Sequence, residues 1–383
     1  MDDTAELRAW LTLLRAPGFG PVAVRAAVSR VGSARAALTA SAVLRELVPG
    51  DAARQWFAAP DAVRIEADLA WLAEPGRRLL RFTEADFPPQ LEHIDHPPAA
   101  LFVAGDAALL LRPQVAVVGA RAASAQGLED ARRFAGHLAA AGLVVTSGLA
   151  DGIDGAAHAA ALDAGGASVA VLGTGVDLVY PRKHATLAAR LIAAGALVSE
   201  YPPGTGARAE HFPQRNRVIA GLALGTLVVE AGLRSGSLIT ARLAVEQGRE
   251  VCVIPGSIHS PLKHGCHRLI RDGARLVEHP QEVLDTLAPG ARLLGEELAN
   301  KLAMSPNNGK QAEKAGELDA DYQALLAALG DEAASLDQLT ARSGLPVAAL
   351  SSMLLLLELD GIVASLPGGR FQRMVQAPEH PAA

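Results

Sequence analysis

The chain has 383 residues, of which 50% are hydrophobic and 20% are charged, and its formal net charge is -6. This length allows two or three domains with buried cores, while the negative charge excludes a protein that coats nucleic acid over its whole surface. Two cysteines predict no disulfide framework, and no apolar run approaches about 18 residues, so we expect a cytoplasmic protein without membrane insertion.

Residues 1–75 predict a small domain of short helices, because apolar residues recur at helical spacing on both sides of a break at Pro17. The break contains Gly18-Phe19-Gly20. Such a turn can hold a phosphate in a helix-hairpin-helix, since its bare backbone lets amides approach the anion. The acidic balance of this region favours the alternative, a tight connection between two helices.

Residues 79–290 predict the central domain, whose first part, residues 79–111, is a proline-rich and aromatic extended lead-in to the edge of a sheet. Beyond it, one pattern recurs along the chain. A helix ends at glycine, an apolar strand follows, and the strand ends in a glycine or a small polar residue. The expected strands are Val115–Gly119, Leu143–Gly148, Val169–Gly173, Leu197–Ser199, Thr226–Glu230 and Val251–Ile254. This recurring order predicts a doubly wound parallel sheet.

The ligand crevice of such a sheet lies beyond the carboxyl ends of its strands. Small residues suited to phosphate follow several expected strands; they are Gly119, Ser147, Gly148, Ser235 and Gly236. Arg121 is the most specific of the residues at this edge, because a guanidinium in the crevice needs an anionic partner. A salt bridge to Asp151 or Asp154 is the structural alternative. The chain has neither a dinucleotide fingerprint nor a Walker A sequence.

The densest stretch of candidate residues runs from Ser199 to Ala241. Its cations are Arg208, Arg215 and Arg217, its ring is Phe212, and its side-chain amide is Asn216. Forked cations beside a ring suit a phosphate backbone with a stacked base. Residues 203–275 carry 10 basic and 5 acidic residues, which supports a local basic patch. The alternative is an ordinary surface loop with solvated arginines before an amphipathic helix.

Two other groups of residues are better explained by structure than by chemistry. His259, His264, Cys266 and His267 have the residue types of a metal site, but their spacing does not converge on one helix face. Carboxylates near strand ends could serve acid–base chemistry, although helix caps and ion pairs explain them as well; they are Asp151, Asp154, Asp177, Glu200 and Glu230. We therefore expect no metal and no other cofactor.

Residues 291–317 lose apolar periodicity and predict a linker, and residues 318–383 predict three helices and a hairpin, the order of a winged helix. The second of these helices is expected to begin at the cap Ser335 and to end near Ser343-Gly344. The third helix, Val347–Asp360, contains no Lys or Arg, so we expect a protein-interaction or regulatory module rather than a major-groove reader. Weak phosphate contact through Arg370 and Arg373 is the alternative.

The central segment, about residues 80–290, resembles the DNA processing protein A family, DprA or Smf. The motifs that carry the resemblance are Val118-Gly119-Ala120-Arg121, Ser147 to Asp154, Gly173 to Asp177 with Tyr180-Pro181, Phe212-Pro213-Gln214-Arg215-Asn216-Arg217, and Ser235 to Ala241. The resemblance implies a Rossmann-like central domain, flanked by a sterile-alpha-motif-like (SAM-like) helical domain and a winged helix.

The resemblance also implies a non-enzymatic protein of natural transformation, which protects incoming single-stranded DNA, forms a homodimer through its Rossmann-like domain and loads RecA for recombination. The family's DNA contacts fall on Arg121, Lys183, Arg208, Arg215 and Arg217, with Phe212 as the stacking ring. Ala120 departs from the Ser or Thr common in the family. The competing reading is a nucleotide phosphoribohydrolase-like enzyme in the same crevice, whose phosphate turn is replaced here by Leu233 to Ser237.

Overall fold

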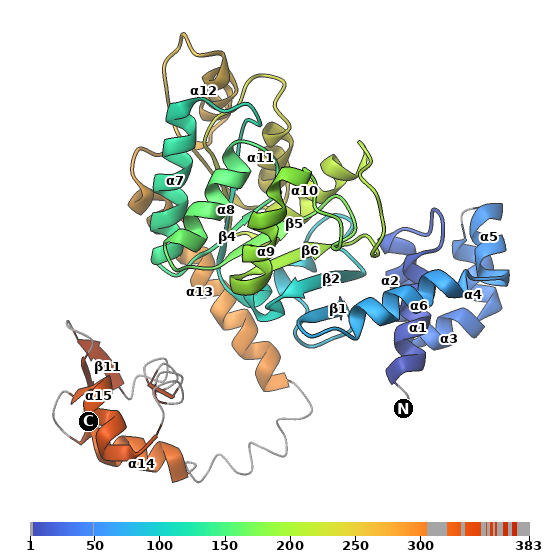
Figure 1. Cartoon of the computed structure of the whole chain (residues 1–383), viewed down its shortest axis with the longest axis horizontal. Coiled ribbons are helices and arrows are strands. Elements are labelled where there is room, and N and C mark those ends of the chain that lie inside the picture. The colour runs from blue at the N-terminus through green and yellow to red at the C-terminus, as the bar shows by residue number, and fades with distance from the viewer. Residues whose placement is uncertain are drawn as a thin grey trace, which may run out of the picture. The chain divides into compact units, whose positions relative to one another are not determined.

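The computed structural model describes residues 3–48, 50–304, 320–330, 334–345, 350, 353–354, 357, 363–366 and 370–373. The chain divides into two compact units, Met1–Lys301 and Leu302–Ala383 (Figure 1). Among the residues that the structure describes, no helix is both long enough and apolar enough to cross a membrane.

Six short helices form the N-terminal part of the first unit, as the sequence predicts. They are α1 (Asp3–Leu14), α2 (Pro21–Val31), α3 (Ala34–Thr39), α4 (Ser41–Leu47), α5 (Asp51–Ala58) and α6 (Ala62–Leu72). Trp10 and Phe19 are buried in their core. This helical domain shares its core with the sheet, since Trp10 lies 5.8 Å from Phe82 and Trp71 lies 6.3 Å from Phe102, measured between ring centroids.

A nine-stranded sheet forms the centre of the unit, in the order β1-β2-β6-β5-β4-β3-β7-β8-β9. Strands β3 to β9 pair in parallel, with Val115 opposite both Val145 and Gly225. Their bounds are β3 (Gln114–Val118), β4 (Val144–Ser147), β5 (Ser168–Val171), β6 (Ala196–Ser199), β7 (Gly225–Val228), β8 (Glu250–Val253) and β9 (Arg275–Leu276). Every strand expected from the sequence is present, while β9 was not predicted.

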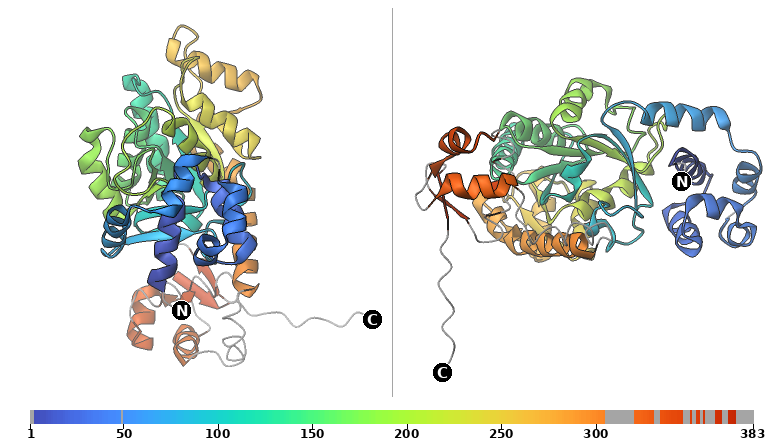
Figure 2. Two further views of the ribbon diagram at one scale, coloured as in Figure 1. Left: turned by 90° about the vertical axis from the view of Figure 1, so that its right-hand side faces the viewer. Right: turned by 90° about the horizontal axis from the view of Figure 1, so that it is seen from below.

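The lead-in contributes strands to the sheet itself. Strand β1 (Arg77–Arg81) pairs antiparallel with β2 (Ala100–Gly105), and β2 pairs antiparallel with β6, placing Phe102 opposite Ser199. Figures 1 and 2 show α1 to α6 beyond this edge of the sheet. The short turns η1 (Pro89–Leu91) and η2 (Ala107–Leu111) lie on either side of β2 in the chain.

Helices cover both faces of the sheet because side chains alternate along each strand. On β3, Val115 and Val117 pack with α7 (Ala125–Ala140), α8 (Ile153–Asp163) and α13 (Pro280–Met304). Ala116 and Val118 face the opposite side, with α10 (His211–Leu222), α11 (Ser237–Glu246) and α12 (His264–Arg271). Helix α9 (Ala185–Ala194) follows the turn η3 (Arg182–His184), and η4 (Pro261–Lys263) precedes α12. The sheet is doubly wound, as expected.

Helix α13 shows that the linker expected from residue 291 is wrong in its first part, because the helix continues to Met304. An apolar stripe that includes Leu287 and Leu294 packs on the sheet and continues past Pro289, which stands inside the helix. The remainder of the expected linker lies outside the described residues.

The second unit contains α14 (Ala320–Leu329), α15 (Leu336–Ser343) and a small sheet of β10 (Ala334–Ser335), β11 (Val363–Leu366) and β12 (Arg370–Arg373), in the order β10-β12-β11. Ser335 caps α15 and Gly344, with φ of 70°, ends it, which confirms both predicted helix limits. The expected third helix falls mostly outside the described residues, although Leu350, Leu354 and Leu357 are buried in the core of this unit.

Candidate nucleic-acid interface

Three neighbouring hollows follow the carboxyl ends of β3 and β4, and Arg121 lines all of them. The first has a volume of about 680 Å³ and lies between Gly119, α10 and the start of α11. The second, of about 80 Å³, includes Tyr180 and Gly148, and the third, of about 370 Å³, includes Lys183. We call this series of hollows the Arg121 groove. It lies at the switch point of the sheet, where β3 separates β4 from β7.

The Arg121 side chain is exposed, and within the described chain it has neither a hydrogen bond nor an ion pair. Its Cζ atom lies 5.8 Å from the centroid of the Phe212 ring. The proposed salt bridges to Asp151 and Asp154 are wrong. Asp151 pairs with Lys183 over 2.9 Å, and Asp154 accepts hydrogen bonds from backbone amides. Arg121 is therefore available to an external anion.

Arg215 is a buried cation in the wall of the groove, with 5% of its surface exposed. Its guanidinium donates to the carbonyl oxygens of Gly148, over 2.8 Å, and Val171. Burial lowers the pKa of Arg215 to about 10, and Asp154 opposes that shift. Burial also raises the pKa of the Asp154 carboxyl, which Arg215 and two backbone amides counteract. These contacts hold the strand ends together and add fixed positive charge behind Arg121.

Most of the residues predicted for the site line the groove. They are Gly119, Arg121, Gly148, Lys183, Phe212, Arg215, Asn216, Ser235 and Gly236. Ser147 is buried and donates its hydroxyl to the Val117 carbonyl. Arg208 is exposed, but it does not line any of the three hollows.

Arg217 lies on another face of α10 from Phe212. It pairs with Glu200 over 2.6 Å, and only 14% of each of these two side chains is exposed. Arg217 lines a separate, largely apolar cleft of about 960 Å³, which also includes Gly18, Gly20 and Tyr201. The motif that contains both arginines therefore divides between two sides of one helix.

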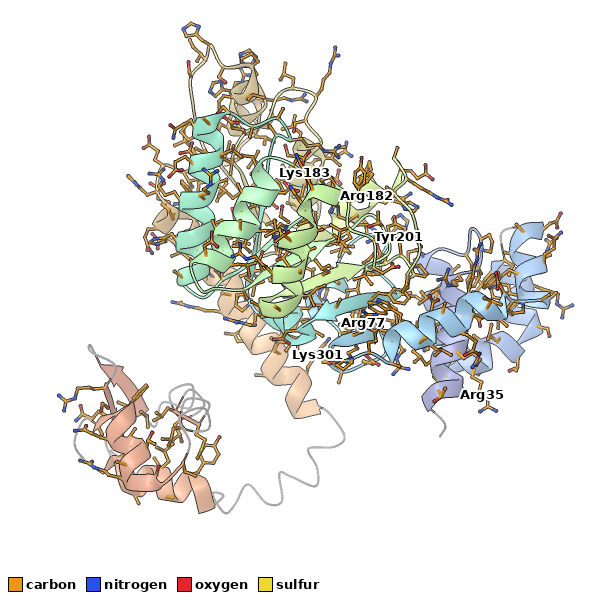
Figure 3. The ribbon with its side chains drawn as sticks, viewed as in Figure 1. Arg35, Arg77, Arg182, Lys183, Tyr201 and Lys301 are labelled. Carbon is orange, nitrogen blue, oxygen red and sulfur yellow. The ribbon has the colours of Figure 1, made fainter. Side chains whose placement is uncertain are left out.

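Two residues of the groove, Tyr180 and Arg234, were not predicted for the site, and neither was Arg182, which lines none of the three hollows but lies next to Lys183 in the chain. Tyr180 is 51% exposed, and its ring centroid lies 5.5 Å from that of Phe212. Arg182 and Arg234 are exposed, and neither has a partner among the residues the structure describes. Figure 3 shows Arg182 beside Lys183 on η3, and Arg234 lines the first hollow of the groove next to Ser235. A sequence signal existed for Tyr180, since Tyr180-Pro181 belongs to the motifs quoted above.

The carboxylates that could have served acid–base chemistry have structural partners. Glu230 is 1% exposed and accepts from the Ser124 amide over 2.9 Å and from the Ser124 hydroxyl over 2.6 Å, at the start of α7. Asp177 accepts from the Gly204 amide over 2.8 Å, and Glu200 pairs with Arg217. The ion pair confirms the structural interpretation for Glu200, whereas Asp177 and Glu230 are neither caps nor ion pairs and instead accept hydrogen bonds from distant segments of the chain.

The candidate metal residues do not converge. Cys266 is fully buried, whereas His264 and His267 bond to the carbonyls of Ile258 and Gly256 over 3.1 and 3.0 Å. Throughout the described residues, no group of three or more His, Cys, Asp or Glu side chains could hold a metal ion. Phosphate recognition is the chemistry that the groove suits best.

Comparison with protein families gives three matches along the chain. Residues 78–288 match the family described as DNA recombination-mediator protein A, and residues 309–369 match the DprA winged helix domain. Residues 4–63 match the DprA-like N-terminal HHH domain. The winged-helix prediction is thereby confirmed, while the helical domain, expected to be SAM-like, matches a family described by a different name.

Relatives extend over most of the chain. Protein Smf of Escherichia coli is 46% identical over 306 residues, which is 80% of each chain. A putative DNA processing protein DprA of Mycobacterium tuberculosis is 36% identical over 382 residues, covering 96% of this chain and 94% of the relative.

Two solved structures are similar to this fold. DprA from Streptococcus pneumoniae superimposes with a TM-score of 0.67 and 36% identity, covering 73% of this chain and 97% of that chain. DNA processing protein A from Helicobacter pylori, a structure described for its single-stranded DNA binding mode, superimposes with a TM-score of 0.51 and 26% identity. The match covers 56% of this chain and 97% of that chain.

Proposed function

Because the chain belongs to the DNA recombination-mediator protein A family, we propose that it binds single-stranded DNA in the Arg121 groove. We further propose that it protects incoming strands during natural transformation and loads RecA onto them. It acts in the cytoplasm, without catalysis, as a homodimer formed through the Rossmann-like domain.

The single observation that carries the DNA site is the exposed guanidinium of Arg121, which has no hydrogen bond or ion pair in the described chain and lines all three hollows. An arginine recognises phosphate through charge-assisted hydrogen bonds. Arg182 and Arg234 are also exposed, and Lys183, with 66% of its side chain exposed, adds charge on η3. Arg121, Arg234 and Lys183 line the hollows, so a strand that follows the groove meets several cations, with Arg182 next to Lys183 in the chain.

Local charge, rather than net charge, supports this binding mode. The protein as a whole carries -6, so its DNA affinity must come from the groove. We propose no enzymatic role because Glu230, the acid–base candidate of the competing enzyme, is engaged with Ser124. The winged helix serves protein contact or regulation in this proposal.

The test is a fluorescence-anisotropy titration of labelled oligo-dT and of a length-matched duplex over a salt series. We expect preference for the single strand, and an affinity that falls with salt by about 0.7 logarithmic units per unit of log salt for each phosphate neutralised. Arg121→Glu should weaken binding by more than about 10-fold, since a charged hydrogen bond becomes a repulsion.

The matched control is Arg35→Glu, which makes the same charge change at an exposed arginine of α3 in the helical domain (Figure 3). Undiminished affinity of Arg121→Glu, or equal losses in both variants, would refute the assigned site. The RecA step is tested by the rate of RecA nucleation on a single strand, which the wild-type protein should raise and Arg121→Glu should not.

A further inference from the structure

The Phe212 ring has three close neighbours. The Tyr180 ring lies 5.5 Å away between centroids, with 40° between the ring planes, and Arg121 Cζ lies at 5.8 Å. A methyl group added at Gly173 would approach Phe212 Cδ1 to 3.0 Å, so the ring already packs closely against this backbone. Phe212 is only partly exposed as a result. Little of its surface remains for a nucleotide base.

Tyr180 presents the larger free surface. Half of its area, 51%, is exposed, although large aromatic side chains usually bury most of theirs. Its hydroxyl has no hydrogen bond to any residue that the structure describes. Tyr180 also lines the small hollow where Arg121, Asp151 and Arg215 meet, so its ring lies beside the cations of the groove.

We propose that Tyr180 provides the base-stacking face of the Arg121 groove and that Phe212 holds the Tyr180 ring in place. The inference rests on the proposed function. It adds recognition of the DNA bases by Tyr180 to recognition of the phosphates by Arg121. It also reverses the role first expected of Phe212, which becomes mainly a support.

Stacking on Tyr180 gives a physical reason for preferring single strands. The bases of a single strand can turn outward onto an aromatic ring, whereas the bases of a duplex are already stacked on one another and paired. Cations alone attract both forms of DNA. The ring and the cations together therefore favour the single strand.

The experiment compares two labelled strands of equal length and phosphate number, oligo-dT and an abasic strand, with the full-length protein. Removal of an aromatic stacking partner typically weakens binding by roughly 5- to 100-fold. We expect Tyr180→Ala to lose that much affinity for oligo-dT and none for the abasic strand. Tyr180→Phe should bind as the wild type does, because the hydroxyl has no partner, and Tyr180→Leu should bind as weakly as Tyr180→Ala.

A tryptophan at this position gives a second readout that packing alone would not produce. The three native tryptophans, Trp10, Trp56 and Trp71, all belong to the helical domain, so Tyr180→Trp adds fluorescence at the groove. We expect oligo-dT to quench the added signal and the abasic strand to leave it unchanged.

The outcomes separate this inference from the proposed function. If the wild-type protein binds neither strand, the DNA-binding proposal fails. If the wild type binds oligo-dT and Tyr180→Ala binds it equally well, only the stacking inference fails. Equal losses of Tyr180→Ala on both strands would show that Tyr180 shapes the groove without contacting bases, and would overturn the inference too. Melting temperatures verify that each variant is folded.

Discussion

Arg217 donates a hydrogen bond to Glu200 over 2.6 Å, and the pair lies on the side of α10 that faces away from Arg121. Phe212, Arg215 and Asn216 are spaced i, i+3 and i+4 along α10 and line the groove. Gln214 and Arg217 are three residues apart and line the other cleft. One helix therefore separates two clefts, and we expect Arg217 to influence DNA binding only through the fold.

Arg217→Met should destabilise the protein. Removing one partner leaves the Glu200 carboxylate buried without compensation, which costs about 3 kcal/mol. Burial already raises the pKa of Glu200, and Arg217 opposes that shift. Urea denaturation should show a lower free energy of unfolding for Arg217→Met than for the double variant Glu200→Met/Arg217→Met. Loss of oligo-dT affinity at unchanged stability would instead mean that Arg217 contacts DNA directly.

Two glycines of the groove should respond differently to alanine. A methyl group at Gly148 would lie 2.6 Å from Arg215 Nη1 and would displace a guanidinium that is buried and hydrogen-bonded. We expect Gly148→Ala to lower the free energy of unfolding by about 1–3 kcal/mol. Gly236 has φ of -62° and open space around it, so Gly236→Ala should leave stability unchanged or raise it slightly.

Measuring oligo-dT binding by these variants distinguishes an effect on protein stability from the loss of a direct DNA contact. Gly236 lines the first hollow of the Arg121 groove, so the added methyl group should weaken DNA binding at full stability. An affinity of Gly236→Ala equal to that of the wild type would remove Gly236 from the interface.

Glu230→Gln tests the alternative hypothesis that the protein is a phosphoribohydrolase-like enzyme. A glutamine keeps one acceptor oxygen and places an amide NH₂ where Glu230 accepts from Ser124, so the free energy of unfolding should fall by about 1–3 kcal/mol. Neither the wild type nor the variant should release free base from a panel of nucleoside monophosphates. Base release that disappears in Glu230→Gln without loss of stability would favour the phosphoribohydrolase.

His158 predicts a loss of stability in acid. Burial lowers the pKa of His158 to about 3 from 6.5, with smaller contributions from His184 and Arg215. The folded state therefore binds this proton less readily than the unfolded state. The stability contributed by neutral His158 is complete above about pH 6.5 and decreases as the pH falls toward 3, by at most about 1.4 kcal/mol per pH unit.

His158→Asn is the variant for this measurement. The Ser168 hydroxyl donates to the Val145 carbonyl, so Nδ1 of His158 donates to Ser168, and an asparagine amide can replace that donor. Urea denaturation between pH 7 and 4 should show a flatter pH dependence for His158→Asn. If the wild type and His158→Asn lost stability equally as the pH falls, His158 would not be the group responsible. The raised pKa values of Asp154 and Glu200 have the opposite effect, because protonation of these buried carboxyls in acid stabilises the folded protein. Both carboxyls are present in the wild type and in His158→Asn, so they do not affect the comparison.

Local patterns in the sequence predicted the elements well where burial follows a regular period. An apolar strand such as Val115–Gly119 and a helix cap such as Ser335 are both specified by residues that are close together in the sequence, and both were predicted. Residues from 291 onward were predicted as a linker because their apolar periodicity is lost, although Leu294 packs on the sheet and α13 continues to Met304. Strand β9 has only two residues, too few to show a period.

The sequence by itself determined the doubly wound sheet and the position of Arg121 at a strand end, because both follow from short-range order. Only the tertiary structure decided which charges are free. Ser124 and Glu230 are 106 residues apart, and Arg217 and Glu200 come from different segments, so their pairing depends on how distant parts of the chain pack. Packing leaves Arg121 and Tyr180 exposed while it buries Arg215, since a side chain's environment is set by its neighbours in space.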